Sequence, residues 1–311
     1  MAPHRFRFGV QLSTAPDGRA WASLARRAEE LGYSSVFVPD HFGDQLAPVP
    51  AIMAAADATS TLRVGALVWD NDYKHPVVLA KEAATIDVLS GGRLELGIGA
   101  GWMRTDYDAA GMDYDSPGTR IARMEEAITV IKGLLGDGPV GFSGTHYTIT
   151  GLEGLPKPVQ RPRPPILVGG GGRKVLTVAG READIVGINV NLKAGEIGPD
   201  AGPNATAEAT AEKIGWVREA AGDRFDEIEL NVAMFFVVIT DDREGTAAAM
   251  ASGFNVTPEE VLQVPHALVG TVDQACEELE RRRAEFGFTY IVVNEPGFEA
   301  LAPVVARLAG T

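Results

Sequence analysis

Two residues that can move a proton, Asp40 and His41, directly follow an apolar segment of the sequence, residues 35–39. Histidine changes its charge near neutral pH, and a neighbouring carboxylate can orient its ring. We therefore interpret His41 as a candidate acid or base, with Asp40 either orienting its ring or lying near the reacting group. A pair of loop residues that only caps a turn would have the same sequence, so this alternative stays open.

A second candidate region is the run of four glycines at residues 169–172, which lies between an apolar segment and a helical pattern beginning near Lys174. Glycine lets backbone N–H groups approach a phosphate, and the N-terminus of a helix attracts anions. We interpret these glycines as a candidate phosphate-binding loop. The alternative is a flexible turn.

Gly97, Gly99 and Gly101 form another glycine-rich segment, which begins within the apolar run 94–98. Glycines at such a position indicate either close approach of a flat ligand or tight packing of the strand on its neighbours. The segment continues with Trp102 and Met103, so the third glycine of a dinucleotide-binding fingerprint is absent. Residues 70–75 are also unusually polar for a connection between a strand and a helix, and they either bind a ligand or form a solvated loop.

The elements that must position these residues alternate along the chain between apolar strands and amphipathic helices. The predicted strands are 6–12, 35–39, 62–69, 94–98, 166–168, 183–188, 229–239 and 290–293, with a hairpin expected within 136–150. These eight strand–helix units, without a break in composition, predict one α/β domain, residues 1–311, with the (β/α)8 TIM-barrel fold and insertions. A doubly wound open sheet is the alternative. Met234, Phe235 and Phe236 are expected in the core, and the run 281–283 on a solvated helix face.

Composition narrows the classes of function. The chain of 311 residues has a formal net charge of −14, which argues against nucleic-acid binding. The five histidines are scattered and the single Cys276 is expected in the core, so no metal site is predicted. No apolar run reaches the roughly 18 residues of a membrane span, and the N-terminus has no export signal, so a cytoplasmic protein is expected.

The sequence resembles the bacterial-luciferase-like oxidoreductases, and within them the branch that uses the deazaflavin coenzyme F420. The resemblance is carried by VPDHF at residues 38–42, by HPVVLAKEAATIDVLSGGRLELGIGAGW at 75–102, by ILVGGGG at 166–172 and by VAGREADIVGIN at 178–189. It covers nearly the whole chain. It implies a luciferase-like (β/α)8 barrel with the tricyclic ring of the cofactor in the barrel mouth.

The resemblance also implies which residues form the site. Asp40 and His41 match the catalytic pair near the ring, and a non-proline cis peptide is expected between Ala66 and Leu67, against the back of the ring. The residues that it assigns to the cofactor are Asp40, Ala66, Leu67, Gly99, Ala100, Gly101, Gly170, Gly171 and Gly172. A sugar-phosphate dehydrogenase branch has a glutamate close to the position of Trp102, so a sugar phosphate is not assigned as the substrate.

The expected activity is therefore hydride transfer between coenzyme F420 and an unidentified organic substrate, with His41 handling a proton. An FMN-dependent monooxygenase that uses reduced flavin and O2 on the same barrel is the first alternative, and a non-catalytic cofactor-binding protein is the second. Trp69, Tyr73 and Trp102 are expected in the pocket wall, and residues 190–206 are a candidate lid. The resemblance suggests a homodimer, and no nucleic-acid, membrane or metal partner is expected.

Overall fold

A computed structural model describes residues 4–196, 202–254 and 257–311. Its main sheet has nine strands in the order β3-β2-β1-β13-β10-β9-β8-β5-β4, and a further pairing between β3 and β5 closes the sheet on itself. All pairings in this sheet are parallel. The described residues thus form a closed parallel barrel surrounded by helices, which confirms the predicted (β/α)8 fold.

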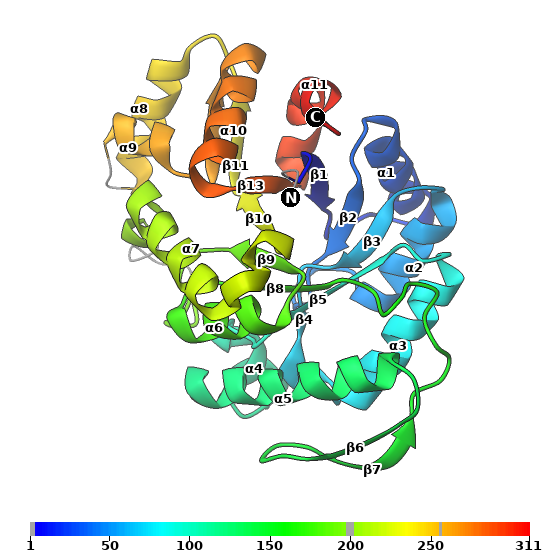
Figure 1. The fold of residues 1–311 in the computed structure, drawn as a ribbon. Coiled ribbons are helices and arrows are strands. Elements are labelled where there is room, and N and C mark those ends of the chain that lie inside the picture. The colour runs from blue at the N-terminus through cyan, green and yellow to red at the C-terminus, as the bar shows by residue number, and fades with distance from the viewer. Residues whose placement is uncertain (1–3, 197–201, 255–256) are drawn as a thin grey trace.

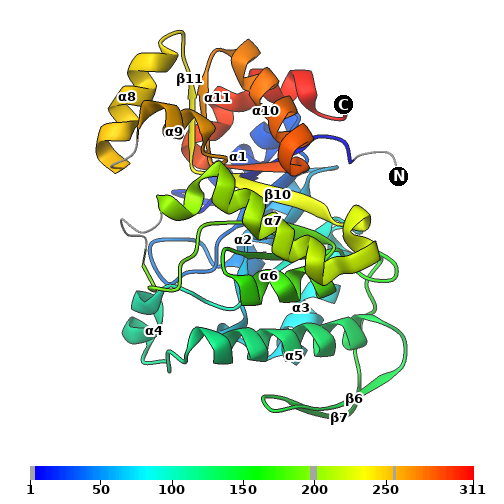
Figure 2. The ribbon, with the colours of Figure 1, turned by 60° about the vertical axis from the view of Figure 1, so that its left-hand side comes forward.

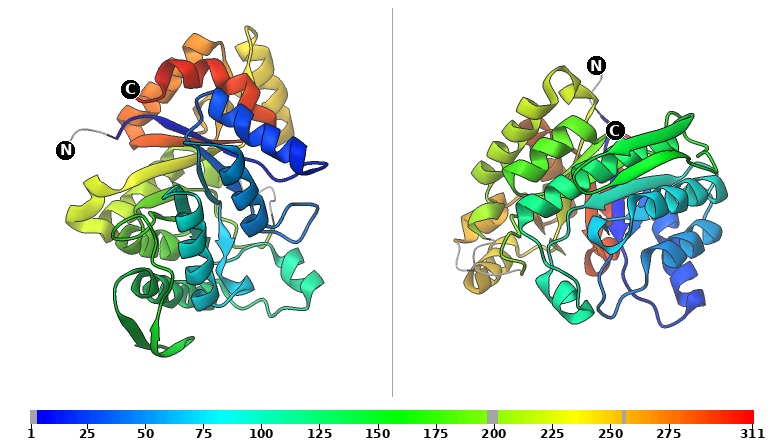
Figure 3. Two further views of the ribbon diagram at one scale, coloured as in Figure 1. Left: turned by 90° about the vertical axis from the view of Figure 1, so that its right-hand side faces the viewer. Right: turned by 90° about the horizontal axis from the view of Figure 1, so that it is seen from below.

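The strands of the barrel come from the whole length of the chain. Apart from the two-residue strand β4 (Trp69–Asp70), the eight strands in the described part are β1 (Arg7–Gln11), β2 (Ser35–Val38), β3 (Arg63–Ala66), β5 (Leu94–Gly99), β8 (Ile166–Gly170), β9 (Ile185–Ile188), β10 (Glu229–Met234) and β13 (Phe288–Asn294). The helices around them (Figure 1) are α1 (Gly18–Glu30), α2 (Pro48–Ala58), α3 (Pro76–Leu89), α5 (Pro117–Leu135), α6 (Arg173–Glu182), α7 (Ala207–Ala221), α10 (Val272–Phe286) and α11 (Glu295–Leu308). The backbone of Phe6, just before β1, donates to the carbonyl of Thr311 at 3.1 Å, so the start of the first strand lies close to the C-terminus (Figure 3).

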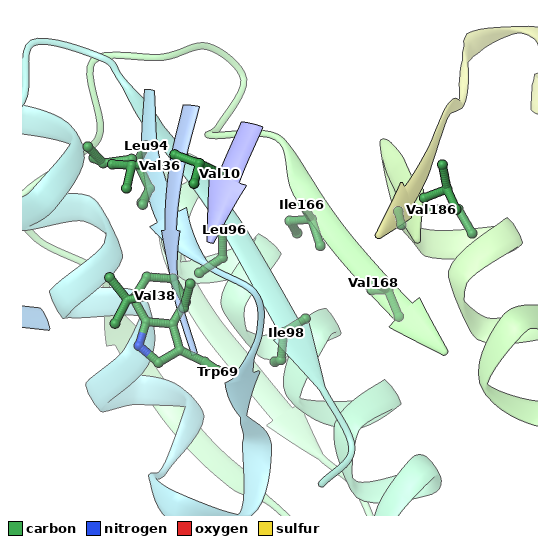
Figure 4. Packing of buried hydrophobic residues seen from close by; sticks show 14 of the residues in the cluster. Val10, Val36, Val38, Trp69, Leu94, Leu96, Ile98, Ile166, Val168 and Val186 are labelled. Atoms are coloured by element: carbon green, nitrogen blue, oxygen red, sulfur yellow. The ribbon is translucent and has the colours of Figure 1, made fainter. Parts of the chain in front are cut away.

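Side chains on the strands alternate between two cores. In β2, Val36 and Val38 belong to the large cluster between the strands and the helices, part of which is drawn in Figure 4, whereas Phe37 belongs to a smaller cluster that also contains Leu167 and Tyr290. Because both faces of each strand are buried, the strands appear in the sequence as continuous apolar runs. This is the pattern from which the barrel was predicted.

The third predicted strand, 62–69, is two strands in the structure. β3 ends at Ala66 and β4 begins at Trp69, with a non-proline cis peptide between Leu67 and Val68. The cis peptide expected between Ala66 and Leu67 is therefore wrong by one residue. No glycine or proline marks the break, so the continuous apolar run predicts a single strand.

The seventh predicted strand, 229–239, also divides. After β10 the chain leaves the barrel as β11 (Phe236–Ile239), which pairs with β12 (Ala267–Gly270), a strand that the sequence did not predict. Between them lie α8 (Arg243–Phe254) and α9 (Pro258–Gln263), at the top of Figure 2. Phe235 and Phe236 are 37% and 41% exposed, so the core position expected for Met234, Phe235 and Phe236 is right only for Met234.

Two further elements lie outside the strand–helix repeat. The predicted hairpin is confirmed as β6 (Pro139–Ser143) and β7 (Thr148–Glu153), which projects beyond α5 in Figures 1 and 2. The short helix α4 (Arg104–Ala110) was not predicted. In α10, the expected solvated face is wrong for Arg282, which is 1% exposed and donates to the carbonyl oxygens of Pro265 and Ala267 at 2.9 and 2.8 Å.

Charged side chains fill the amino-terminal end of the barrel. Glu95 of β5 is fully buried, accepts hydrogen bonds from Nε of Arg63 at 2.6 Å and from the Tyr290 hydroxyl at 2.9 Å, and is paired with Arg7. Arg7 also donates to Glu229 at 2.7 Å. Burial alone would raise the pKa of Glu95, but the charges of Arg7 and Arg63 outweigh it and hold that pKa below its ordinary value. Glu95 is therefore an ionised carboxylate between two guanidinium groups.

Candidate active site

The exits of three neighbouring strands bring predicted site residues to the other end of the barrel. Asp40 and His41 follow β2, Leu67 follows β3, and Gly99 is the last residue of β5. The backbone of Leu67 donates to the carbonyl of Val38 at 3.1 Å, so the exits of β2 and β3 are side by side. These residues lie at the carboxyl ends of parallel strands, where barrel enzymes place their active sites.

His41 is held by a residue that the sequence analysis missed, Asp106. Nδ1 of His41 lies 2.7 Å from Oδ2 of Asp106, and the hydroxyl of Tyr73 donates to the same oxygen at 3.1 Å. A carboxylate only accepts hydrogen bonds, so Nδ1 is the donor and Nε2 of the neutral ring remains an acceptor. The carboxylate that accepts this hydrogen bond and orients His41 is therefore Asp106, so Asp40 does not take the orienting role, one of the two roles considered for it.

Helix α4 places Asp106 against His41. The helix starts directly after the glycine-rich exit of β5 and ends at Gly111, whose φ of 68° suits glycine. Asp106 is only 7% exposed. A helix of seven residues has too few apolar positions for a periodic signal, which is why α4 was missed. The one sequence signal that could have pointed to Asp106 was its position, a carboxylate four residues after Trp102.

Further carboxylates lie beside this pair. Oδ2 of Asp40 accepts a hydrogen bond from the backbone of Asp70 at 3.1 Å, and the carboxylate of Asp70 accepts hydrogen bonds from the hydroxyl of Tyr107 at 3.1 and 3.2 Å. Burial raises the pKa of Asp40. Burial, with a contribution from the charge of Asp72, also raises the pKa of Asp70 to about 7. Asp70 is thus protonated for part of the time near neutral pH.

The raised pKa of Asp70 makes the stability of the protein depend on pH. Because the folded pKa of about 7 exceeds the ordinary value of 3.8, the stabilising contribution is fully present below pH 3.8 and is lost as the pH rises through 7. The variant Asp70→Asn has no ionisable group at this position, so it should not lose this contribution as the pH rises. We expect the unfolding free energy of the variant minus that of the wild type to increase by more than about 1 kcal/mol between about pH 4.5 and about pH 8. Urea titrations at both pH values measure the gain. Asp223→Asn, at an exposed position, is the matched control, and a gain for Asp70→Asn no larger than for this control would contradict the expectation.

The glycines at the exit of β5 are explained by packing. Gly101 has a φ of 74°, and a Cβ there would lie 1.9 Å from the Tyr107 hydroxyl and 2.6 Å from Oδ2 of Asp70. A Cβ on Gly99 would lie 2.5 Å from a methyl group of Val68. Of the two interpretations left open by the sequence, these contacts support tight packing and do not require a ligand.

The glycines after β8 differ among themselves. A Cβ on Gly171 would lie 2.2 Å from the carbonyl oxygen of Val190, and one on Gly170 would lie 2.4 Å from Val175, so both make room for the protein itself. The nearest atom to a Cβ on Gly172 is 3.8 Å away. Gly172 is also the N-cap of α6, and no side chain caps this helix. The candidate phosphate site therefore narrows to Gly172 and the first turn of α6.

The residues expected in the pocket wall separate into two groups. Trp102 is half-buried and meets His41 edge-on, with 5.6 Å between ring centroids, and Tyr73 reaches the same site through Asp106. Trp69 is fully buried and belongs, with Val38, to the large cluster between the strands and the helices (Figure 4), so a place in the pocket wall is wrong for it.

The remaining expected residues take several positions. Ala66 is buried at the end of β3, whereas Ala100 is half-buried and its carbonyl oxygen accepts a hydrogen bond from Arg120 at 3.3 Å. The candidate lid, residues 190–206, is described only in part, because residues 197–201 lie outside the described residues. In its described part, the carbonyl of Gly195 accepts a hydrogen bond from the backbone of Arg104 at 3.1 Å.

Within the described ranges, no group of three or more His, Cys, Asp or Glu side chains could hold a metal ion. No helix in that part of the chain is long and apolar enough to span a membrane. Cavities of about 450 and 430 Å³ lie in the region of α8 to α10. Their lining residues include neither His41 nor its neighbours.

The closed parallel barrel and the histidine–carboxylate pair at the carboxyl ends of its strands define a (β/α)8-barrel protein with a candidate active site where barrel enzymes place theirs. The sequence model of the luciferase-like monooxygenase family matches residues 4–255, and the chain belongs to this family.

Relatives in the family fall into two groups by cofactor. The chain is 31% identical over 174 residues to an F420-dependent glucose-6-phosphate dehydrogenase of Amycolatopsis mediterranei, a match that covers 53% of this chain and 52% of the relative. It is 26% identical over 282 residues to an FMNH2-dependent dimethylsulfone monooxygenase of Pseudomonas putida, which covers 89% of this chain and 73% of the relative. The chain thus spans about half the length of the first relative.

Among solved structures, the coenzyme F420-dependent tetrahydromethanopterin reductase of Methanopyrus kandleri matches with a TM-score of 0.79 and 20% identity, over 98% of this chain and 100% of that one. At this level of identity the likeness concerns the fold alone.

Proposed function

We propose that this chain is a coenzyme F420-dependent oxidoreductase that transfers a hydride between the deazaflavin and an organic substrate. The observation that carries the proposal is the contact of His41 with Asp106 at the exit of β2, 2.7 Å between Nδ1 and Oδ2, on the barrel of this family. The F420-dependent relative supports the choice of cofactor.

The residues around the mouth fit a flat ring. Leu67 and Val68 are half-buried and pack on the cluster that contains Phe37 and Tyr290. Their remaining exposed surface is apolar, as the face of a tricyclic ring requires. Asp40, a further residue of the proposed site, lies at the next strand exit.

The N-terminus of α6 fits the phosphate of the cofactor. Its first turn has no side-chain cap, and the open surroundings of Gly172 leave room for a ligand. Lys174 is exposed in the same turn. Backbone N–H groups and the positive end of the helix dipole, together with Lys174, suit a negatively charged phosphate group.

In this proposal the side chains position reactants and move a proton. When bound, the deazaflavin would supply a two-electron hydride acceptor or donor. Asp106 fixes the tautomer of His41, so that Nε2 can take the proton of a substrate hydroxyl as the hydride leaves its carbon, or return a proton in the reverse direction. Tyr73 donates to the same carboxylate and restrains its position.

The alternative is an FMN-dependent monooxygenase that uses reduced flavin and O2. The dimethylsulfone monooxygenase favours it, because that relative matches 89% of this chain. Oxygen uptake with reduced FMN, in the presence of organic sulfur compounds, is the expected result for this alternative.

Titration of the apoprotein with oxidised deazaflavin and with FMN tests the proposal. We expect binding of the deazaflavin in the micromolar range, weak binding of FMN, and quenching of tryptophan fluorescence, since Trp102 contacts His41. The opposite preference would favour the monooxygenase. Binding of neither compound would overturn both assignments.

A homodimer and a small-molecule substrate belong to the same proposal. Exposed apolar side chains on one side of the barrel support a dimer: Leu89 of α3 is 65% exposed, and Leu155 and Val159 after β7 are 56% and 54% exposed. Leu155 and Val159 both lie along α3 or its C-terminal end: Lys81 of α3 donates to the carbonyl of Leu155 at 3.1 Å, and a Cβ on Gly92 would lie 3.3 Å from the side chain of Val159. The mass of the protein in solution, measured by light scattering, tests the dimer.

A further inference from the structure

Aromatic rings flank His41. Phe42 follows it in the chain and stacks on Tyr73, with 4.4 Å between centroids and 27° between planes. Trp102 meets His41 edge-on at 5.6 Å. Phe42 is nevertheless 52% exposed, so one face of its ring lies on Tyr73 and the other is open. A large aromatic surface is therefore available beside the candidate acid or base.

The polar groups around this surface are acidic. Asp40, Asp70 and Asp106 lie in one network with His41 and Tyr73. Each of these carboxylates, when ionised, adds negative charge in a partly buried place where water screens it poorly.

The cations nearby are already engaged: Lys74 and Arg123 with carboxylates, and the buried Arg120 with the carbonyl oxygens of Ala100 and Gly101, at 3.3 Å each. Lys74 pairs with Glu82 at 2.8 Å. Arg123 pairs with Asp72 at 2.8 Å and also with Asp115. Burial raises the pKa of Asp40 and the charge of Lys74 only partly opposes this, so the engaged cations offset only part of the negative charge of the His41 network.

We propose that the substrate reaching His41 is an uncharged organic molecule whose flat apolar part lies on the open face of Phe42, and that organic anions are excluded. This inference rests on the proposed function, because it names the class of substrate for that site. An aromatic ring offers stacking to a planar ligand. A carboxylate or phosphate on the ligand would meet the acidic network, where Lys74, Arg120 and Arg123 already have partners within the protein.

Three fluorescent probes of matched shape test the inference: 2-naphthol, 2-naphthoate and 2-naphthyl phosphate, titrated into the cofactor-loaded and the cofactor-free protein at neutral pH. We expect 2-naphthol to bind at least about tenfold more tightly than either anion, a difference of about 1.4 kcal/mol. We expect Phe42→Ala to weaken binding of 2-naphthol by about threefold to tenfold. Phe42 is exposed, so this variant is expected to fold.

Charge is tested separately from shape. Asp40→Asn should reduce the ratio of the dissociation constant of 2-naphthoate to that of 2-naphthol. Asp223→Asn, which removes the same charge from an exposed position, should leave this ratio unchanged. Higher salt should also narrow the preference.

Each outcome decides the inference. Equal or tighter binding of an anion, an unaltered affinity in Phe42→Ala, or no binding of any probe would overturn it. Failure of the proposed function is a separate result, because it appears in the deazaflavin and FMN titrations, which measure the cofactor without any probe.

Discussion

The substitution His41→Ala is expected to lower kcat by about 10²- to 10⁴-fold, the contribution that a positioned general acid or base commonly makes. Nε2 of His41 is the atom proposed to take the proton, and alanine removes it without replacing it. Binding of the deazaflavin should change little, because the proposed contacts of the cofactor come from other residues. Single-turnover absorbance of the deazaflavin gives the rate, and fluorescence titration gives the affinity.

Two variants make this expectation specific. Asp106→Asn should lower kcat as well, because an amide no longer imposes the tautomer in which Nδ1 carries the proton. His146→Ala, in the turn between β6 and β7, should leave the rate unchanged. Loss of cofactor affinity with an unchanged rate in His41→Ala would assign His41 to binding, and equal rates in all the variants would favour a non-catalytic protein.

The largest expected effect on stability comes from Glu95→Gln. The substitution leaves the guanidinium groups of Arg7 and Arg63 without their shared carboxylate, and removing one partner of a buried ion pair commonly costs about 3–5 kcal/mol. The arginine side chains are 22% and 29% exposed, so water offsets part of the loss and we expect about 3 kcal/mol. Urea denaturation followed by circular dichroism measures the change in the midpoint.

An exposed ion pair provides the control for Glu95. Glu285→Gln, in α10, removes a carboxylate that pairs with Arg281 where both side chains are more than 40% exposed. Solvent screens such pairs, and we expect a change within about 0.5 kcal/mol. Similar midpoints for Glu95→Gln and the wild type would show that the network contributes nothing to folding.

The fold was largely predictable because a closed parallel barrel has a strong sequence pattern. Strands buried on both faces appear as continuous apolar runs, and the runs that contain β2, β5 and β9 were found with small errors at their ends. The same pattern hides breaks: Leu67 and Val68 are apolar, so nothing in the sequence separates β3 from β4. Likewise β11 continues the apolar run of β10 although it leaves the barrel.

The candidate site was less predictable, because its contacts join distant parts of the chain. His41 was found from its place after a strand, but its partner Asp106 is 65 positions further along and comes from an unpredicted helix. Gly99 and Gly101 were noticed for their type, whereas their reason, room for Val68 and Tyr107, depends on packing. Arg282 shows the same limit, since its charge suggested solvent and its hydrogen bonds lie in the interior.

The ionic network at the amino-terminal end of the barrel has a kinetic consequence. Arg7, Glu95 and Arg63 fill that end, and the cluster that contains Phe37 and Tyr290 fills the interior, so the two reactants of the proposed function would reach and leave the site only through the opening at the carboxyl end. The reactant that sits deeper binds first and leaves last. Steady-state rates should therefore follow an ordered mechanism. A product that stays in the opening should slow the release of the more deeply bound reactant.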